Sequence, residues 1–419
     1  MNVLVLGGGG REHALVWRLR RSASVKEVHA LPGNAGIAAE ATCWAGAADD
    51  IPRVLQVCRE GRINFVIAGP ERPLIAGVAD AVRDMGVPVY GPSKACAQLE
   101  GSKAFAKSVM HAAGVPTGHY RDFTEFEPAV AYISEEWRSG RHVVVKASGE
   151  AMGKGVIVPT NEDEAIEAAR RALVDGEFGE AGRTIVVEEK FSGRELSVLA
   201  ICSGTEYRVL PPARDYKKAN DGDDGPNTGG MGAFSPVPDV TDAQVATCAE
   251  TFIAPILREM ERRGTPYVGT LYAGLMLSPF GTIALEYNVR FGDPETQAIL
   301  PRLAGDFCDL LYRAATGADL PDVTVAEEGA VAVVVAASGY PGDYKKGIPV
   351  PQVHADDALL VFHAGTMLSD GQLLSSGGRV LNVVGIGPTL DAARERAYAA
   401  IDDRFNSEWH FRKDVALIS

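Results

Sequence analysis

The feature of this sequence that most constrains its fold is the segment from Ile283 to Gln297, which reads I-A-L-E-Y-N-V-R-F-G-D-P-E-T-Q. Apolar and polar side chains alternate along its first half, and successive side chains of a β-strand point to opposite faces of the sheet. We therefore predict a strand whose polar face carries Glu286, Asn288 and Arg290. This strand, at 282–290, is expected to pair with a strand at 267–277 across a turn at 278–281. The side chains predicted to enter the core are Ile283, Leu285, Tyr287 and Val289.

The polar face of this strand carries a carboxylate, an amide oxygen and a guanidinium group. Mg²⁺ prefers hard oxygen ligands, and an arginine binds an anion through parallel hydrogen bonds. Glu286 and Asn288 are therefore candidate metal ligands beside Arg290, which is a candidate anion-binding residue. A solvated face with a structural ion pair is the alternative interpretation.

The chain after Arg290 is predicted to begin a helix directly. Asp293 is expected to be its N-cap and Pro294 its first residue, a position that tolerates the missing N–H of proline. The free backbone donors and the positive dipole end of a helix start favour a bound anion. The strand is therefore expected to deliver its polar face to an anion-binding helix start.

The amino-terminal region alternates apolar strands with helical segments, which indicates a parallel sheet with helices on both faces. The strands are predicted at residues 2–6, 25–31, 63–68 and 87–90. A glycine loop at 7–10 lies between the first strand and a helix, which is the layout of a phosphate-binding unit. The dinucleotide fingerprint is not met, because its third glycine falls on Glu12 or His13, and NAD binding is therefore disfavoured.

Ligands of such a sheet bind at the carboxyl ends of its strands. We expect a sugar phosphate there, although the glycines could also serve only to make turns. The candidate residues are Gly8, Gly9, Gly10, Arg11, Asn34, Pro70 and Glu71.

Two glycine-rich loops in the middle of the chain are candidates for nucleotide binding. Lys146 ends a predicted strand at 142–147 and precedes the loop 149–155, so its ammonium group can reach phosphates. The P-loop pattern is not met, because no serine or threonine follows the G-K pair. The second loop, 221–232, ends in G-P-N-T-G-G-M-G and is predicted to form no regular element. A hairpin turn and a disordered surface tip are the respective alternatives.

Composition narrows the class of protein. With 419 residues, 46% of them hydrophobic and 23% charged, the chain is expected to be a soluble globular protein of several domains. Its net charge of −14 disfavours binding to nucleic acid or to anionic membranes. Six dispersed cysteines without a C-x-x-C pair, and no signal or membrane-spanning segment, favour the cytoplasm.

The octet R-F-G-D-P-E-T-Q at 290–297 resembles the signature of the glycinamide ribonucleotide synthetase (phosphoribosylamine–glycine ligase) family of the ATP-grasp superfamily. The segments G-G-R-E-H-A-L, P-G-N-A-G, G-S-K-A-F-A-K and G-P-N-T-G-G-M-G resemble the same family, and the resemblance covers the whole chain. It implies a mixed α/β and α+β chain with an ATP-grasp fold. The implied domains are a Rossmann-like parallel-sheet domain at 1–102, an ATP-grasp region at 103–320 with a mobile nucleotide lid at about 121–190, and a small α+β domain at 326–419.

The resemblance also implies roles for particular residues. The implied ATP-binding residues are Lys107, Lys146, Lys154, Glu188, Glu189, Phe191, Glu195 and Asn227. Among them, the strand end at 188–191 is expected to hold the adenine and Glu195 to bind the ribose. The implied substrate-binding residues, beyond the amino-terminal set, are Asp215, Arg290, Gly292 and Asp293. Lys146, Asp215 and Arg290 are the implied catalytic residues, and Mg²⁺ or Mn²⁺ is expected on Glu286 and Asn288.

The activity that the resemblance implies is ATP-dependent ligation of glycine to 5-phospho-β-D-ribosylamine in purine biosynthesis. The glycine carboxylate would be activated as glycyl phosphate, and the products would be N1-(5-phosphoribosyl)glycinamide, ADP and phosphate. The implied enzyme is a cytoplasmic monomer with small-molecule partners only.

Two other functions stay open at this point. A different ATP-grasp enzyme, such as a biotin carboxylase or another purine ligase, is one, because Lys146-Ala147-Ser148-Gly149 is closer to the carboxylase loop. The synthetases usually have aspartate at Ser148, a small apolar residue at Glu150 and histidine at Tyr216. A carboxylase, however, should lack both G-P-N-T-G-G-M-G and R-F-G-D-P-E-T-Q. The other is a non-catalytic nucleotide-binding or NAD-dependent protein, which would bind ATP or NAD and release no phosphate when glycine and phosphoribosylamine are both supplied.

Overall fold

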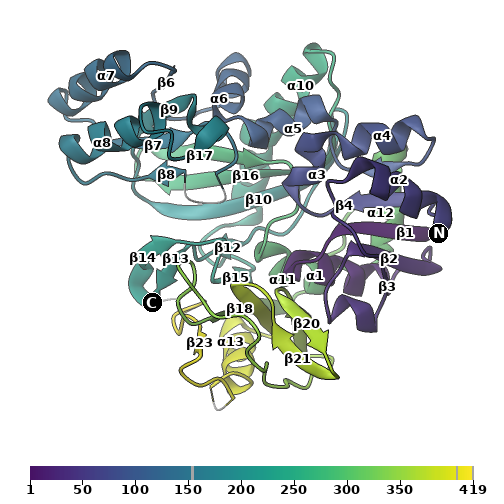
Figure 1. Ribbon diagram of the computed structural model, residues 1–419. Coiled ribbons are helices and arrows are strands. Elements are labelled where there is room, and N and C mark those ends of the chain that lie inside the picture. Colours follow the sequence, from purple (N-terminus) through teal and green to yellow (C-terminus); the bar gives the residue numbers. More distant parts are fainter. Residues whose placement is uncertain (152–154, 403, 418–419) are drawn as a thin grey trace.

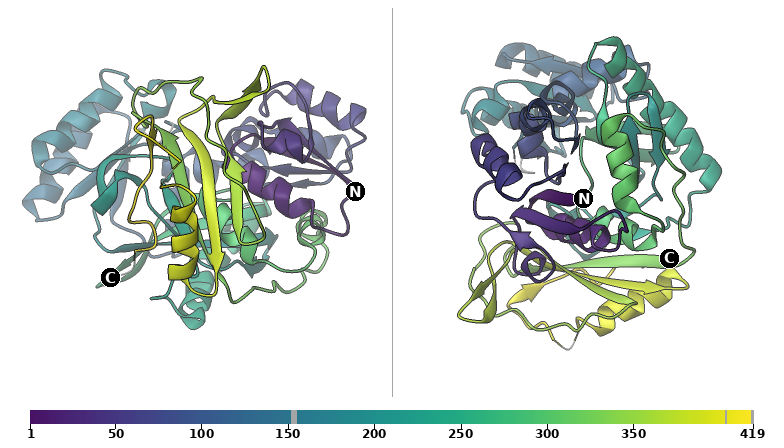
Figure 2. Two further views of the ribbon diagram at one scale, coloured as in Figure 1. Left: turned by 90° about the horizontal axis from the view of Figure 1, so that it is seen from below. Right: turned by 90° about the vertical axis from the view of Figure 1, so that its right-hand side faces the viewer.

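The computed structural model describes residues 1–151, 155–402 and 404–417. Figure 1 shows the amino-terminal sheet on the right, the carboxy-terminal sheet below, and a central layered region whose far end carries α7 (Phe126–Arg138) and α8 (Glu162–Leu173). In Figure 2 the first helix, α1 (Gly10–Leu19), lies beside the carboxy-terminal sheet, and it contacts β19 (Leu359–His363) there. Every helix in the described ranges is too short or too polar to cross a bilayer.

The amino-terminal sheet is parallel throughout, in the order β3-β2-β1-β4-β5, which confirms the predicted parallel sheet. Its strands are β1 (Asn2–Gly7), β2 (Glu27–Pro32), β3 (Thr42–Cys43), β4 (Phe65–Ala68) and β5 (Val89–Tyr90). Besides α1, its helices are α2 (Ile51–Glu60), α3 (Glu71–Ala76), α4 (Val78–Asp84) and α5 (Lys94–Gly101). The carboxyl ends of β1, β2 and β4 place their loops at one edge, as the alternation of strands and helices predicts.

The central sheet is antiparallel, in the order β11-β10-β16-β17. Its strands are β10 (Arg194–Ser203), β11 (Glu206–Val209), β16 (Val268–Ser278) and β17 (Gly281–Asn288). The predicted hairpin is confirmed, since β16 pairs with β17 across a turn at Pro279 and Phe280. The helices near this sheet are α6 (Lys103–Ala112), α9 (Asp242–Cys248), a π-helical turn (Ala249–Ile253) and α10 (Ala254–Arg262).

The predicted alternation along β17 is wrong at Ile283 and Leu285, which were both expected in the core and are only half-buried. A β-bulge places Glu286 opposite Gly274 and Ala284 opposite Leu275, so Leu285 has no direct partner on β16. Ala284 is therefore buried and Leu285 is not, because the extra residue of a bulge shifts the alternation by one position. The residues after the bulge keep their predicted faces, and Tyr287 is buried while Glu286 lies on the other face.

The segment predicted as a lid forms a four-stranded sheet in the order β6-β9-β7-β8, covered by α7 and α8. Its strands are β6 (Tyr120–Phe123), β7 (Val143–Ala147), β8 (Val156–Ile157) and β9 (Ile185–Glu189). Buried side chains of this sheet and its helices make a hydrophobic cluster separate from the main core. The lid segment therefore has a core of its own.

The carboxy-terminal sheet has the order β12-β15-β18-β22-β19, with β23 (Trp409–His410) also paired to β18. Its other strands are β12 (Arg214–Asp215), β15 (Gly232–Ser235), β18 (Gly329–Ala337) and β22 (Arg379–Gly387). A hairpin of β20 (Thr366–Ser369) and β21 (Gln372–Ser375) and the helix α13 (Leu390–Ala399) complete this region. Since β12 and β15 come from the middle of the chain, they tie the loop between them to this sheet.

The prediction that residues 221–232 form no regular element is wrong. Residues Asp224–Asn227 form β14, which pairs with β13 (Lys218–Asn220), and Gly232 begins β15. Backbone pairing needs no side chain, so a glycine-rich segment can still join a sheet where a neighbouring strand offers donors and acceptors.

The predicted cap at Asp293 is also wrong. The helix α11 spans Glu295–Ile299 with Pro294 as its N-cap, and the carboxylate of Asp293 is engaged elsewhere. Its Oδ1 accepts a hydrogen bond from Gln297 Nε2 at 2.7 Å, and its Oδ2 pairs with Arg379 Nη2 at 2.9 Å. A charged partner from β22 therefore replaces the helix start as the neighbour of this acid. The next helix is α12 (Phe307–Thr316), which Asp306 caps.

Candidate functional site

A cluster of lysines and carboxylates lies where the lid segment meets the central sheet. Glu188 of β9 is buried, and its carboxylate pairs with Lys107 Nζ of α6 at 2.5 Å and with Lys146 Nζ of β7. Burial would raise the pKa of Glu188, but the two lysines hold it below its usual value. Lys107 also donates to Thr117 Oγ1 at 2.7 Å. The structure therefore brings three of the predicted ATP-binding side chains together.

Glu286 on β17 faces the same cluster. Burial alone would raise the pKa of its carboxyl group, but Lys217, Lys146 and Lys103 hold it below its usual value. Within the described ranges, none of the hydrogen bonds ends on this carboxylate, so its oxygens keep free lone pairs for a cation. The neighbouring Asn288 offers an amide oxygen, which accepts from Arg290 Nη2 at 3.2 Å. In the part of the chain that the structure describes, no group of three or more His, Cys, Asp or Glu side chains is arranged to hold a metal.

Arg290 lies between two carboxylates of the amino-terminal region. Its Nε donates to Glu71 Oε2 at 3.0 Å, and its Nη2 pairs with Glu100 Oε1 at 2.9 Å. Burial alone would raise the pKa of both acids. For Glu71, the charges of Arg290 and Arg11 outweigh burial and lower the pKa to about 2. For Glu100 burial wins, and its pKa rises to about 7. Arg290 lowers the pKa of both acids, but at Glu100 burial and the nearby charge of Glu71 outweigh it.

Asp215 on β12 is a buried acid with an unused oxygen. Among the described residues its Oδ1 has no hydrogen-bond partner, and Lys217 Nζ lies 3.8 Å away. Burial raises the pKa of Asp215 to about 7, and Lys217 opposes that rise. The lysine also pairs with Glu195, the acid predicted to bind the ribose of ATP. Nearby, Tyr272 donates to Glu295 Oε1 at 2.5 Å, so α11 adds a further buried acid.

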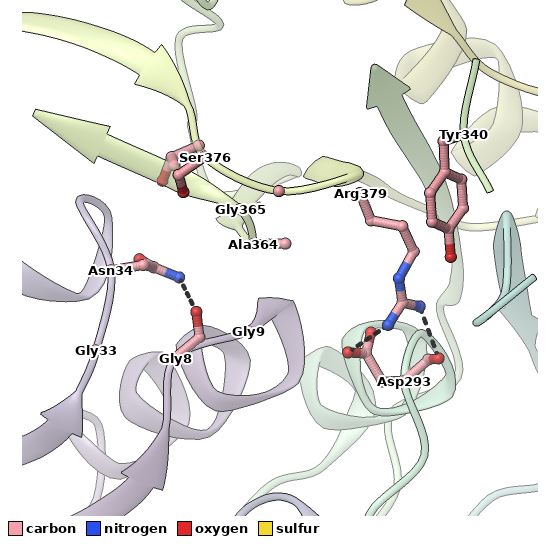
Figure 3. A pocket seen from close by; sticks show the side chains of 12 residues that line it. Gly8, Gly9, Gly33, Asn34, Asp293, Tyr340, Ala364, Gly365, Ser376 and Arg379 are labelled. Carbon is pink, nitrogen blue, oxygen red and sulfur yellow. Dashed lines mark hydrogen bonds and ion pairs between the residues drawn. The ribbon is translucent and has the colours of Figure 1, made fainter. Parts of the chain in front are cut away.

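A cavity of about 350 Å³ lies between the amino-terminal loops and the carboxy-terminal sheet, and we call it the phosphate pocket. Its lining residues are Gly8, Gly9, Gly33, Asn34, Asp293, Tyr340, Ala364, Gly365, Thr366, Ser376, Gly377 and Arg379. Figure 3 shows Asn34 and Gly8 on one side, with Asn34 Nδ2 donating to the Gly8 carbonyl at 3.0 Å. The same side-chain amide donates to the His363 carbonyl at 2.7 Å and so joins both walls.

Arg379 is the cation of this pocket. Figure 3 shows its guanidinium paired with Asp293, and its Nη1 also donates to the carbonyl of Gly229 at 2.7 Å. The Gly229 amide in turn donates to the Tyr340 hydroxyl at 3.0 Å. Burial would raise the pKa of Asp293, but Arg379 and Arg11 hold it below its usual value. The arginine thus links the glycine-rich loop, the R-F-G-D-P-E-T-Q segment and the pocket.

The structure separates other predicted residues from this cavity. Arg11 is buried, with Nε on Glu12 Oε1 at 2.6 Å and Nη1 donating to the Phe291 carbonyl at 3.0 Å, and it does not line the pocket. Gly10 packs against Asn382, whose amide nitrogen would lie 2.2 Å from an added Cβ. Pro70 is the N-cap of α3.

In the strand end that is predicted to bind adenine, some backbone N–H groups already make hydrogen bonds within the protein. The Glu189 amide donates to the His119 carbonyl and the Lys190 amide to the His142 carbonyl, both at 2.8 Å. Phe191 packs on Gly118, where an added Cβ would lie 2.7 Å from its ring. Asn227 ends β14, Gly292 precedes Asp293, and Lys154 lies outside the described residues.

Two of the three departures from the family pattern have a structural explanation. Ser148 Oγ accepts from the Ala104 amide at 3.1 Å, so it joins the lid segment to the start of α6. The Tyr216 hydroxyl accepts from the Ala416 amide at 2.9 Å, and the guanidinium carbon of Arg412 lies 4.5 Å from its ring centroid. Both side chains therefore make contacts that hold segments together.

Sequence reasoning missed the residues that the carboxy-terminal region contributes. Arg379, Tyr340, Thr366 and Ser376 line the pocket, and Glu100 and Lys217 surround the predicted site. The run S-S-G-G-R before the strand at 379 was the available signal, because paired glycines beside a serine and an arginine suit a phosphate.

Models of the phosphoribosylglycinamide synthetase family match almost the whole chain. The N domain matches residues 1–100, the ATP-grasp (A) domain matches 101–296, and the C domain matches 330–417. A phosphoribosylamine–glycine ligase of Rhizobium meliloti (strain 1021) is 45% identical over 417 residues, which cover 99% of this chain and 98% of that relative.

Two solved structures share the fold. Phosphoribosylamine–glycine ligase from Thermotoga maritima superposes with a TM-score of 0.86 at 33% identity, covering 99% of this chain and 100% of its own. A biotin carboxylase domain of the 2-oxoglutarate carboxylase from Hydrogenobacter thermophilus superposes with a TM-score of 0.76 at 17% identity. The match covers 98% of this chain and 91% of that domain's chain. The second likeness shows the fold alone. The predicted ATP-grasp fold class is confirmed.

Proposed function

The chain belongs to the phosphoribosylglycinamide synthetase family, and on that premise we propose that it ligates glycine to 5-phospho-β-D-ribosylamine at the expense of ATP. The products are N1-(5-phosphoribosyl)glycinamide, ADP and phosphate, in purine biosynthesis. The observation that carries the proposal is that a lysine-rich site facing Glu286 and a pocket with Arg379 are joined through Arg290 and Asp293 in one chain segment.

The triphosphate of ATP binds among Lys107, Lys146 and Lys103 in this proposal. These ammonium groups lie between β7, β9 and β17, so they neutralise phosphate charge between the lid segment and the central sheet. The strand end at 188–191 holds the adenine, and Glu195, with Lys217 beside it, faces the ribose. Asn227 and Lys154 complete the proposed set of ATP-binding residues.

Glu286 and Asn288 fit a divalent cation. They supply a carboxylate with free oxygens and an amide oxygen, which are the hard donors that Mg²⁺ and Mn²⁺ accept. A small set of protein ligands suits a cation that also binds phosphate oxygens. When bound, the cation would neutralise charge on the phosphates, and the surrounding lysines orient the nucleotide.

The phosphate pocket receives the phosphoribosyl group. Its glycine backbones allow close approach, while Arg379 and the donors of Asn34, Thr366 and Ser376 suit the phosphate and the hydroxyl groups. Asp293 lines this pocket and Glu71 pairs with Arg290, so the two carboxylates suit the ribose and its amine. Arg11 supports the pocket from behind through the Phe291 carbonyl.

The carboxylate oxygen of glycine is a poor leaving group, so it must be phosphorylated before an amine can displace it. The glycine carboxylate attacks the γ-phosphoryl group, ADP leaves, and the amine then displaces phosphate from glycyl phosphate. Arg290 binds the glycine carboxylate or the leaving phosphate, Lys146 spreads the developing charge, and Asp215 holds the glycine ammonium group. Closure of the lid segment excludes the water that would hydrolyse the acyl phosphate.

We also propose the division into units at 1–102, 103–320 and 326–419, with the lid at about 121–190. The separate core of the lid segment supports its motion as one body. A monomer is supported by the exposed large apolar side chains, which are scattered over several elements. Six unpaired cysteines support a cytoplasmic location.

Measurement of ADP release with each substrate omitted in turn tests the proposed activity. We expect rapid release only when ATP, a divalent cation, glycine and phosphoribosylamine are all present. A second arm replaces glycine and phosphoribosylamine with biotin and bicarbonate. Equal ADP release in that second arm, or no ADP release with the complete mixture, would refute the proposal.

A further inference from the structure

Two histidines lie directly behind one wall of the phosphate pocket, and neither lines it. His13 belongs to α1 and His363 ends β19, and their ring centroids are 5.6 Å apart. The wall in front of them is the segment 364–366, whose residues all line the pocket. The pair therefore joins the amino-terminal helix to the carboxy-terminal wall.

A chain of hydrogen bonds runs from His13 to the pocket. The backbone amide of His363 donates to His13 Nδ1 at 2.7 Å. Because Nδ1 accepts, the ring proton of His13 must sit on Nε2, which lies 3.3 Å from Glu40 Oε1. His363 Nδ1 lies 3.1 Å from Thr366 Oγ1, and burial and His13 lower the pKa of His363 to about 4, so its ring is uncharged.

Gly36 shows how tightly this contact is packed. Its backbone angles, φ −72° and ψ −45°, are open to any residue. An added Cβ would nevertheless lie 2.4 Å from His13 Cε1 and 2.5 Å from His363 Cγ. The glycine is therefore required by the two imidazole rings and not by its own backbone conformation.

We propose that His13 is a positioning residue, which fixes the 364–366 wall of the phosphate pocket by accepting the backbone N–H of His363. The inference rests on the proposed function, since it takes the pocket to bind the phosphoribosyl group. Without the acceptor, a partly buried N–H loses its partner and the wall shifts to find another. A shifted wall weakens ground-state and transition-state binding alike, which raises KM and leaves kcat unchanged.

The test compares two substitutions that each keep one half of the imidazole. In His13→Asn the side-chain oxygen reaches the place of Nδ1 and can accept the His363 amide. In His13→Gln the amide reaches the place of Nε2 and leaves Nδ1 unreplaced. His111→Gln, at an exposed position of α6, is the control.

We expect His13→Gln to raise KM for phosphoribosylamine about tenfold, with kcat and the KM values for ATP and glycine unchanged. His13→Asn should restore KM to within about threefold of wild type. Binding of ribose 5-phosphate, measured by calorimetry, should weaken by the same factor in His13→Gln. The control should match wild type in every measurement.

The inference is overturned if His13→Gln keeps the wild-type KM, or if the two substitutions raise KM equally. Gly36→Ala is an independent variant whose added methyl group displaces the rings of His13 and His363. If His13→Gln does not fold, the same measurements on Gly36→Ala test the positioning role. Wild-type protein that neither ligates nor binds ribose 5-phosphate refutes the proposed function instead. Wild-type activity with an unaffected His13→Gln variant refutes only the positioning role.

Discussion

Two buried carboxylates near the end of β17 have opposite pKa shifts, because they face different numbers of cations. Burial would raise the pKa of Glu286, but several lysines surround it and hold its pKa below the usual value. Glu100 shares the single guanidinium of Arg290 with Glu71, and burial raises its pKa to about 7. The charge of each acid is therefore set by its neighbours and not by its type.

The first residue to test is Glu286. The Glu286→Gln substitution keeps the size of the side chain and removes its charge, so the fold should remain intact. Loss of one preorganised electrostatic contact costs roughly 10²- to 10³-fold in kcat, and we expect a loss in that range. ADP release at saturating substrate measures it, with Glu261→Gln on the exposed face of α10 as the control. Wild-type turnover in Glu286→Gln would refute the metal assignment.

Glu100 is expected to make the stability of the protein depend on pH. Its pKa is raised from 4.5 to about 7 in the folded state, mainly by burial. The folded state therefore binds a proton that the unfolded state has released, and the free energy of unfolding falls as pH rises through this window. The stabilising contribution of Glu100 is fully present below the pKa of this group in the unfolded state, 4.5. It is lost as the pH rises through the folded-state pKa of about 7.

The Glu100→Gln variant isolates this effect, because glutamine does not titrate. We expect the difference in unfolding free energy between wild type and variant to change by up to about 3 kcal/mol across the window. Urea titrations near pH 5 and near pH 8 measure it. Glu261→Gln serves again as the exposed control, and a pH-independent difference for Glu100→Gln would contradict the assignment.

At the scale of elements, close backbone contacts decide how strands and helices join. β22 and α13 meet at Gly385, where an added Cβ would lie 2.0 Å from the Ala393 carbonyl oxygen. No side chain can move to relieve that contact, because the atoms nearest to the added Cβ belong to the backbone of Ala393 and Ala397. The glycine therefore sets the distance between the carboxy-terminal sheet and its helix.

The Gly385→Ala substitution should destabilise the protein for this reason. Overpacking in a closed core costs about 1–3 kcal/mol, and rigid backbone on both sides places the expected loss at the upper end. The unfolding free energy in urea measures it. Gly342→Ala is the control, because Gly342 is exposed and its nearest contact to an added Cβ is 3.2 Å. Equal stability of the two variants would show that the sheet and helix can separate without cost.

At the scale of the whole molecule, two proposed binding regions lie on different bodies of the chain. The lid segment packs around its own hydrophobic cluster, and it contacts α6 through the Lys103 amide, which donates to the Ser148 carbonyl at 2.8 Å. The phosphate pocket lies instead between the amino-terminal loops and the carboxy-terminal sheet. Each ligand should therefore affect a different part of the molecule.

Hydrogen exchange followed by mass spectrometry can separate these two regions. ATP with Mg²⁺ should slow exchange several-fold in peptides of β7 and β9, because it ties them to β17. Ribose 5-phosphate should slow exchange at residues 8–36 and 363–379 and leave the lid segment unchanged. Peptides of α2, remote from both regions, provide the control. Equal protection of both regions by either ligand would contradict the assignment.

Much of the fold could be predicted because its signals are local. Apolar runs with glycine turns predicted the parallel sheet, and the paired strands around Pro279 and Phe280 were predicted as a hairpin. The bulge at Leu285 escaped prediction, because it depends on how β16 and β17 align. The pairing of Asp293 with Arg379 also escaped prediction, because the two residues are 86 positions apart in the sequence.

The sequence by itself determined the family, the order of the elements and most of the candidate residues, because motifs and periodicity act over a few neighbouring residues. Only the tertiary structure decided which of these residues share a pocket and which acids keep their charge. Asn34 and His363, for example, are 329 positions apart in the chain and joined by one hydrogen bond. Contacts of that kind, and the burial and charge that come with them, depend on the packing of whole regions and leave no local pattern.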